Sequence, residues 1–198
     1  MNRLLFIILI FTTAGISACG TENTVPSAAP VLTPATDLRF TRSTIDDDAN
    51  GPAFSEIADV DGDGREDIVV SQFGLIEGTA INPGSITIYY QGRDVGDWSR
   101  TETVFSVEDG IYWPNELTLK DIDGDGDLDL AVGTGFLVCG FLPRLNAAGQ
   151  QSPASPCGGL LWFEQTSSGW QRNDIVAPTS TLFYHKPVIV DFDGDGIL

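Results

Sequence analysis

DIDGDGDLD, residues 121–129, is the stretch that decides the fold, and the chain repeats it with small changes. Residues 59–67 read DVDGDGRED, and residues 191–198 read DFDGDGIL. In each stretch the carboxylates alternate along a loop that two glycines bend, so that they can converge on one hard cation together with a backbone carbonyl at position 7. Calcium accepts about six to eight oxygens in a flexible geometry. Three such loops in one chain predict a repeating architecture.

Two other interpretations of the loops are solvated turns and EF-hands. Asp-Gly pairs favour turns by themselves. In each of the three loops, however, the alternate carboxylates lie only a few residues apart and would repel one another without a cation. An EF-hand loop needs a bidentate glutamate at position 12 and a helix on each side. Position 12 is Val70 in the first loop and Val132 in the second. The loops are therefore predicted to join strands.

Short apolar or alternating segments around the loops predict strands. They cover residues 54–58, 68–71, 86–90, 117–120, 130–133 and 160–163. Segments with an aromatic residue two positions before an arginine, at 40–42, 98–100 and 170–172, are predicted to open a further strand, and another strand is expected just after His185. Each unit then holds about four strands, the content of one β-propeller blade. Without a long amphipathic helical pattern after residue 36, the predicted class is all-β.

The three loops, the apolar strands after the first two, the Phe73-Gly74 pair and the aromatic-x-Arg segments resemble the FG-GAP/VCBS repeats. These repeats build the calcium-binding β-propeller of integrin α-subunit heads and of many bacterial surface proteins. The resemblance covers residues 37–198. The chain departs from the family's pattern in two ways. No Gly-Ala-Pro element follows Phe73-Gly74, and the acid that would close the third loop falls one residue past Leu198. Since such propellers usually have more blades than the two complete units here, the chain is expected to be the N-terminal part of a longer protein.

The resemblance implies three Ca²⁺ sites, each made of aspartate side chains and the backbone carbonyl at position 7. The first would use Asp59, Asp61, Asp63 and Asp67 with the carbonyl of Arg65. The second would use Asp121, Asp123, Asp125 and Asp129 with the carbonyl of Asp127. The third, incomplete site would use Asp191, Asp193 and Asp195 with Ile197.

The N-terminus predicts export and a lipid anchor. A basic start at Asn2-Arg3 precedes an apolar run, residues 4–11, which is too short for a membrane span of about 20 residues. Residues 16–19, Ile-Ser-Ala-Cys, resemble a bacterial lipobox, so residues 1–18 are expected to be a lipoprotein signal peptide and Cys19 the lipidated residue. An ordinary secretory signal is the alternative. Residues 19–36, rich in Thr, Ser, Ala and Pro, are predicted to be a flexible tether. Gly20 after the cysteine favours the outer membrane or cell surface.

Cysteine use agrees with export. Without Cys19, the pair Cys139 and Cys157 remains, and in an oxidising compartment an even number of cysteines predicts a disulfide. The pair brackets a segment rich in Pro, Gly, Gln and Ser between two predicted strands. A zinc site is the weaker alternative, since no second Cys or His lies close to either thiol in the sequence.

Charge and motifs narrow the function. The net charge is −18, and the three loops hold 13 of the 28 acidic residues. This acidity, without a basic cluster, argues against nucleic acid. The run Asp46-Asp47-Asp48 is interpreted as a solvated loop, and His185, the only histidine, as structural. No motif of a serine hydrolase, zinc protease or phosphate-binding loop is present.

The sequence therefore predicts a lipid-anchored, calcium-stabilised surface β-propeller, a binding or scaffold module for protein or glycan partners. Partner contacts are expected at the end of the blades opposite the calcium loops, from residues 74–84 and 140–156. One alternative is the accessory propeller of a polysaccharide-active or other hydrolytic enzyme, with its catalytic part beyond Leu198. Another is a purely structural protein of the cell envelope.

Overall fold

The computed structural model describes residues 40–74, 76–196 and 198. The chain divides into two units, Met1–Thr41 and Arg42–Leu198, and the account below concerns the second unit by itself. The predicted signal peptide (1–18), the lipidation site Cys19, the tether (19–36) and Ile197 lie outside the described residues. Within the described part of the chain, no helix has the length and apolar character needed to cross a membrane.

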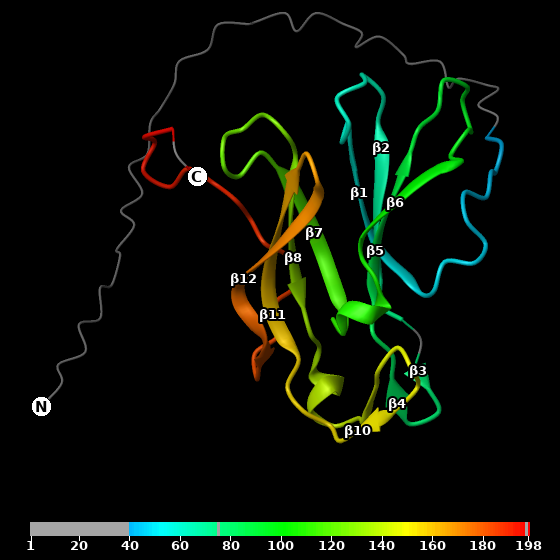
Figure 1. The fold of residues 1–198 in the computed structure, drawn as a ribbon, viewed down its shortest axis with the longest axis vertical. Helices are drawn as coiled ribbons and strands as arrows, with labels where there is room; N and C mark the ends of the chain where they lie inside the picture. The colour runs from blue at the N-terminus through cyan, green and yellow to red at the C-terminus, as the bar shows by residue number, and fades with distance from the viewer. Residues whose placement is uncertain (1–39, 75, 197) are drawn as a thin grey trace, which may run out of the picture. The chain divides into compact units, whose positions relative to one another are not determined.

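Two four-stranded antiparallel sheets form the body of the second unit (Figure 1). The first sheet contains β1 (Pro52–Ala58), β2 (Asp67–Gln72), β5 (Ser85–Tyr90) and β6 (Arg100–Phe105). The second contains β7 (Pro114–Lys120), β8 (Asp129–Thr134), β11 (Gly158–Thr166) and β12 (Gly169–Ser180). The orders β1-β2-β5-β6 and β7-β8-β11-β12 describe one topology used twice. The all-β prediction is confirmed, and a strand lies on each side of the first two acidic loops, as expected for propeller blades and not for EF-hands.

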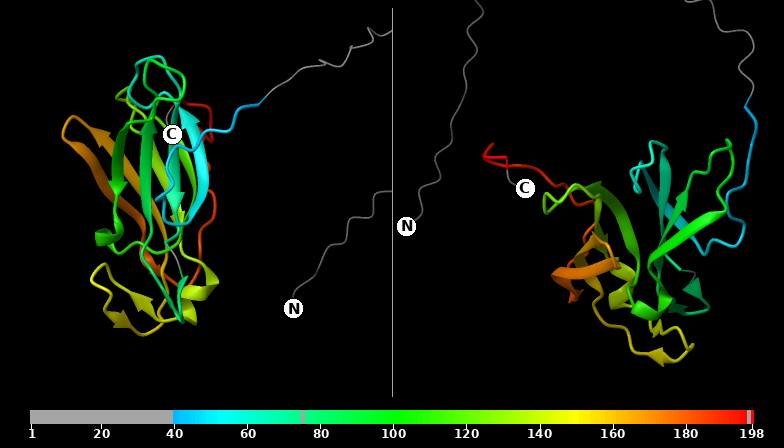
Figure 2. Two further views of the ribbon diagram at one scale, coloured as in Figure 1. Left: turned by 90° about the vertical axis from the view of Figure 1, so that its right-hand side faces the viewer. Right: turned by 45° about the horizontal axis from the view of Figure 1, so that its top comes forward.

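The main core lies between these two sheets, which form separate layers in the right-hand view of Figure 2. The rings of Phe105 and Phe163, one from each sheet, stack with centroids 5.2 Å apart. Strands β2 and β11 alternate between buried and less buried positions over part of their length, whereas β8 is buried throughout. Burial of each large apolar side chain contributes about 1.5–3 kcal/mol. Fully buried core residues from both sheets are Val69, Ile86, Ile88, Leu117, Leu130, Val132 and Leu161.

A third, small sheet links the two larger ones at the end opposite the acidic loops, here called the insert end (Figure 1). Its strands are β3 (Ile76–Glu77), β4 (Ala80–Ile81), β9 (Arg144–Leu145) and β10 (Gln151–Ser152). The segments at 74–84 and 140–156 thus join each other: β4 pairs with β9 in parallel, and the Ile81 amide donates to the Pro143 carbonyl at 2.9 Å. Strands of two residues have no readable periodicity, so the sequence predicted only two separate segments.

A disulfide joins Cys139 and Cys157, with their Cα atoms 5.8 Å apart, as the sequence predicted. The two cysteines are buried in a second apolar cluster with Ile81 and Tyr112. The Tyr112 hydroxyl donates to the Leu145 carbonyl at 2.8 Å. Closing a loop across an 18-residue separation stabilises a fold by about 3 kcal/mol in the chain-entropy model. Two 3₁₀-helices, η1 (Val107–Asp109) and η2 (Leu137–Gly140), complete the elements.

Two of the expected strands are not formed. Residues 40–42 and 185–190 carry no strand, whereas β6 begins at Arg100 and Trp170 lies within β12, as expected. A strand needs a neighbour to satisfy its backbone groups, and the described residues before β1 and after β12 offer none. Residues 185–190 lie along β7 instead, where the carbonyl of Pro187 accepts from the Thr118 hydroxyl at 2.7 Å.

Candidate metal centres in the acidic loops

The first aspartate of each loop organises its backbone. In the second loop, Asp121 accepts hydrogen bonds from the amides of Gly124 at 2.7 Å and Gly126 at 3.1 Å. Both glycines have left-handed backbones, with φ of 83° and 101°, a conformation that glycine adopts without steric cost. In the first loop, Asp59 accepts from the Gly64 amide at 2.8 Å. The Asp-x-Asp-Gly-Asp-Gly pattern therefore sets the loop conformation through hydrogen bonds within the motif itself.

The third loop shares this arrangement. Asp191 accepts from the amides of Gly194 at 2.6 Å and Gly196 at 2.7 Å. These hydrogen bonds, led by that from Gly196, hold the pKa of Asp191 below its usual range, since each amide favours the ionised carboxylate.

The last aspartate of each complete loop has a second function, which sequence reasoning missed. Asp129 is fully buried and accepts from the Ile122 amide at 3.0 Å and from the Gln165 amide, at the end of β11, at 2.9 Å. Asp67 does the same in the first loop with Val60 and Gln91, both at 2.9 Å. Each carboxylate thus ties its loop to the third strand of the same sheet. The partner groups are backbone amides, which leave no signal in the sequence.

The structure brings three predicted carboxylates together in each loop. One ligand atom from each of three residues lies within 4.8 Å of the others in the sets Asp59/Asp61/Asp67, Asp121/Asp123/Asp129 and Asp191/Asp193/Asp195. Asp63 and Asp125, at position 5, are outside these sets. Clustered carboxylate oxygens suit a hard divalent cation such as calcium. A carboxylate oxygen that accepts one amide also keeps a lone pair for a cation.

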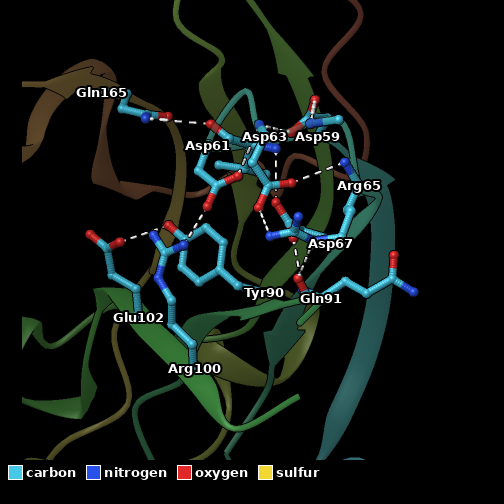
Figure 3. A network of polar contacts seen from close by, with 12 residues as sticks. Asp59, Asp61, Asp63, Arg65, Asp67, Tyr90, Gln91, Arg100, Glu102 and Gln165 are labelled. Atoms are coloured by element: carbon cyan, nitrogen blue, oxygen red, sulfur yellow. Dashed lines mark hydrogen bonds and ion pairs between the residues drawn. The ribbon is translucent and has the colours of Figure 1, made fainter. Parts of the chain in front are cut away.

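Two arginines occupy the first loop (Figure 3). The Arg65 guanidinium forms an ion pair with Asp63, and its Nε donates to the Gln91 carbonyl at 2.8 Å. Arg100, at the start of β6, forms an ion pair with Asp61. This contact raises the pKa of Arg100. These guanidinium groups lie on predicted ligands, so a metal ion entering the first loop has to compete with them.

The Arg100 guanidinium is itself held in place by the same sheet. It lies 3.7 Å from the ring centroid of Tyr90, a cation–π contact. The Tyr90 hydroxyl donates to Glu102 at 2.7 Å, and burial together with this carboxylate raises the pKa of Tyr90. From the second sheet, the Gln165 side chain donates to the Val60 carbonyl at 3.5 Å, which is a weak link between the sheets beside the loop (Figure 3).

His185 lies away from the acidic loops. Its ring meets the edge of Phe54 at 5.3 Å, and its Nδ1 is 3.4 Å from a Glu116 oxygen. Lys186 lies 3.1 Å from the other Glu116 oxygen, and this carboxylate raises the pKa of Lys186. The histidine thus packs and pairs with neighbouring side chains. In the acidic run at 46–48, Asp46 accepts from the Tyr89 hydroxyl at 2.6 Å.

Comparison with known proteins finds one match. Residues 59–132 match the model of the FG-GAP-like repeat family. The matched segment contains both complete acidic loops and extends from Asp59 into β8, so it includes the junction between the two sheets. No curated protein and no solved structure matches the chain.

Proposed function

We propose that this protein is an exported β-propeller module whose acidic loops bind calcium and whose insert end binds a protein or glycan partner. The observation that carries the proposal is the recurrence of one loop geometry, with three carboxylates gathered within 4.8 Å in each of three loops. The family match over residues 59–132 supports the repeat type. The two sheets of identical strand order support the blade architecture.

The residues fit a calcium ion in each complete loop. Asp59, Asp61 and Asp67 would hold one ion, with Asp63 joining if Arg65 releases it. Asp121, Asp123, Asp125 and Asp129 would hold another. A bound calcium supplies positive charge and oxygen ligation, and so removes the repulsion among these carboxylates. The third ion would use the carboxylates of Asp191, Asp193 and Asp195 and the carbonyl of Ile197.

The proposed role of calcium is structural. Four carboxylates would quench much of the Lewis acidity of an ion, so we propose that the sites stabilise loops and do not activate water. The affinity is expected to be modest, with a Kd on the order of 10⁻⁴ to 10⁻³ M, as in extracellular calcium modules.

We also propose that the chain is attached to the outer membrane or cell surface through lipid on Cys19. Residues 20–36 would separate the folded unit from the membrane. The insert end would then offer the third sheet, which combines segments of both larger sheets, as the surface for the partner. The basis for this choice is topological: the acidic loops and the inserts lie at opposite ends of β2 and β8.

Calorimetric titration of the folded protein with CaCl₂, after removal of metal by EDTA, tests the calcium proposal. We expect saturable binding of Ca²⁺ in the range given above. Mg²⁺ should bind more weakly, because it requires a nearly ideal octahedral coordination that these loops do not impose. The Tm should fall in EDTA and recover with excess CaCl₂. The matched control is Asp174→Ala, because Asp174 is an exposed aspartate of β12, outside the acidic loops, that forms an ion pair with Arg172. Absence of binding, or a Tm that ignores EDTA, would refute the calcium role.

A further inference from the structure

The two complete acidic loops differ at position 3. In the first loop, Asp61 forms an ion pair with Arg100, which belongs to the edge strand β6 of the first sheet. Its equivalent in the second loop, Asp123, accepts only the Asp125 amide among the described residues. Asp61 is also one of the three carboxylates gathered in the first loop. A divalent cation and a guanidinium on one carboxylate repel each other, so Asp61 is better served by one of them at a time.

The Arg100 side chain has a second support, which does not depend on Asp61. Arg100 is paired directly opposite Tyr90 of β5, and its guanidinium carbon lies 3.7 Å from the Tyr90 ring centroid. An aromatic face attracts a cation by itself. The Arg100 side chain is 59% exposed, so solvent leaves it room to turn. The guanidinium can therefore leave Asp61 and stay on the ring.

A second carboxylate lies within reach of the same guanidinium (Figure 3). Arg100 and Glu102 are two residues apart in β6, so their side chains share one face of the sheet. Glu102 accepts the Tyr90 hydroxyl at 2.7 Å, and a carboxylate has enough lone pairs to accept a guanidinium as well. Strand β12 shows that this spacing permits pairing, because the Nε of Arg172 donates to Asp174 at 2.7 Å.

We propose that Arg100 is a two-position switch that couples calcium binding in the first loop to the edge strand β6. In one position its guanidinium neutralises Asp61. When Asp61 binds calcium, the guanidinium turns on the Tyr90 ring and pairs with Glu102. The inference rests on the proposed calcium binding and adds regulation to it, because the arrangement of charge along β6 then depends on calcium.

The energies of the two positions are similar enough for a switch. Both are ion pairs of an exposed arginine, and an exposed ion pair changes an equilibrium by about fivefold at most. The exchange of Asp61 for Glu102 therefore costs little. A ligand shifts such an equilibrium by its differential affinity for the two states, and calcium binds Asp61 better in the state that Arg100 has left.

The first test follows the unchanged, folded protein by NMR while CaCl₂ is added after removal of metal by EDTA. The amides of Gly64 and Gly126 report calcium in the first and second loops separately. We expect the side-chain Nε–Hε signal of Arg100 and the carboxyl ¹³C signal of Glu102 to shift with the same Kd as Gly64. If both loops bind calcium and the Arg100 signal stays in place, the switch is wrong and the calcium proposal stands. If neither loop responds to calcium, both proposals are overturned.

Variants test the coupling through Arg100. Arg100→Gln should tighten calcium binding at Gly64 by up to about fivefold and leave binding at Gly126 unchanged. Glu102→Gln should weaken binding at Gly64, because the released arginine loses its second partner. The same substitution in the Arg100→Gln protein should have no effect. Arg172→Gln is the control and should alter neither loop.

The double variant separates the switch from a simple effect of charge. If Glu102→Gln weakens calcium binding equally with and without Arg100, Glu102 acts on the ion directly and the switch is refuted. Tm measured in EDTA verifies that each variant is folded. The titration of the unchanged protein needs no substitution, so it decides the proposal even if a variant does not fold.

Discussion

The first and second acidic loops share a backbone and differ in charge. In both loops the first aspartate accepts a hydrogen bond from the amide of the glycine at position 6. The last aspartate accepts one from the amide at position 2. It accepts a second from the amide of a glutamine at the end of the third strand or just after it, Gln91 in the first sheet and Gln165 in the second. The first loop carries Arg65 and receives Arg100. The second has Asp127 at the place of Arg65, and Arg172, from the aromatic-x-Arg segment of β12, pairs with Asp174. Among the described residues, no basic side chain pairs with the second loop.

This difference separates two functions of the motif. The aspartates and glycines that accept or donate hydrogen bonds form the loop, and this part is common to both copies. The balance of charge decides how much each loop needs a cation. The first loop has two guanidinium groups on its predicted ligands, whereas the second has only carboxylates. We therefore expect the second loop to depend more on calcium than the first.

The largest effect should come from the part that the loops share. Asp67→Ala and Asp129→Ala each remove a buried carboxylate that accepts two amides, and we expect a loss of about 3 kcal/mol in unfolding free energy for each, because hydrogen bonds to charged groups are worth about 1.5–3 kcal/mol. Urea unfolding in EDTA measures the two losses without metal. Asp63→Ala, at a position outside the carboxylate clusters, is the control. Losses that differ by more than about 1.5 kcal/mol between the two sites would break the equivalence of the loops.

A second prediction separates the loops by their need for calcium. We expect Asp123→Ala to abolish most of the rise in stability that calcium produces, and Asp61→Ala to abolish less, because Asp61 is already paired with Arg100. A ligand at ten times its Kd stabilises a protein by about 1.4 kcal/mol, which sets the size of the effect. The measurement is Tm in EDTA and in excess CaCl₂ for each variant. The double variant Asp61→Ala with Asp123→Ala should show little response. Equal responses of the two single variants would refute the asymmetry.

A third prediction exchanges the charges. Arg65→Asp should strengthen calcium binding to the first loop, and Asp127→Arg should weaken binding to the second. An exposed ion pair is worth up to about 1 kcal/mol, or about fivefold in affinity. Arg100→Gln should act like Arg65→Asp, while Arg172→Gln, which removes the arginine that pairs with Asp174, is the control. Calorimetric titration with CaCl₂ at low salt measures the change in calcium affinity for both variants. If Arg65→Asp leaves the first affinity unchanged, Arg65 does not compete with the metal.

Local patterns explain why much of the fold was predictable. Alternation at 54–58 and 117–120 and the apolar runs after the loops predicted β1, β7, β2 and β8, because side chains of a strand point to opposite faces in turn. The loop conformation was predictable for a similar reason. Asp121 and the glycines it contacts are within five residues of one another, so the motif contains both partners of each hydrogen bond.

The parts that were missed depend on long-range contacts. Arg100 lies 39 residues from Asp61, and nothing near either residue indicates their pairing. The junction of β4 with β9 joins two inserts through a single backbone register pair. The strand expected after His185 failed for the complementary reason. Its sequence suits a strand, but strand formation depends on a neighbouring strand, which the described residues do not provide.

The smallest effect concerns the third loop, in which Asp191 accepts hydrogen bonds from two glycine amides as Asp121 does in the second loop. The amides of Gly196 and Gly194 hold the pKa of Asp191 below its ordinary value, so in EDTA Asp191 should stay ionised to a lower pH in the folded protein than in the unfolded chain. Because the pKa is lower in the folded state, the stabilisation is present above the unfolded value of about 3.9 and is lost as pH falls through the folded pKa. Carboxyl ¹³C shifts follow the titration, and the same residue in urea-denatured protein supplies the reference. If Asp191 titrates at the same pH in both states, its hydrogen bonds from the Gly194 and Gly196 amides do not form in solution. The loop would then need the cation to take its shape.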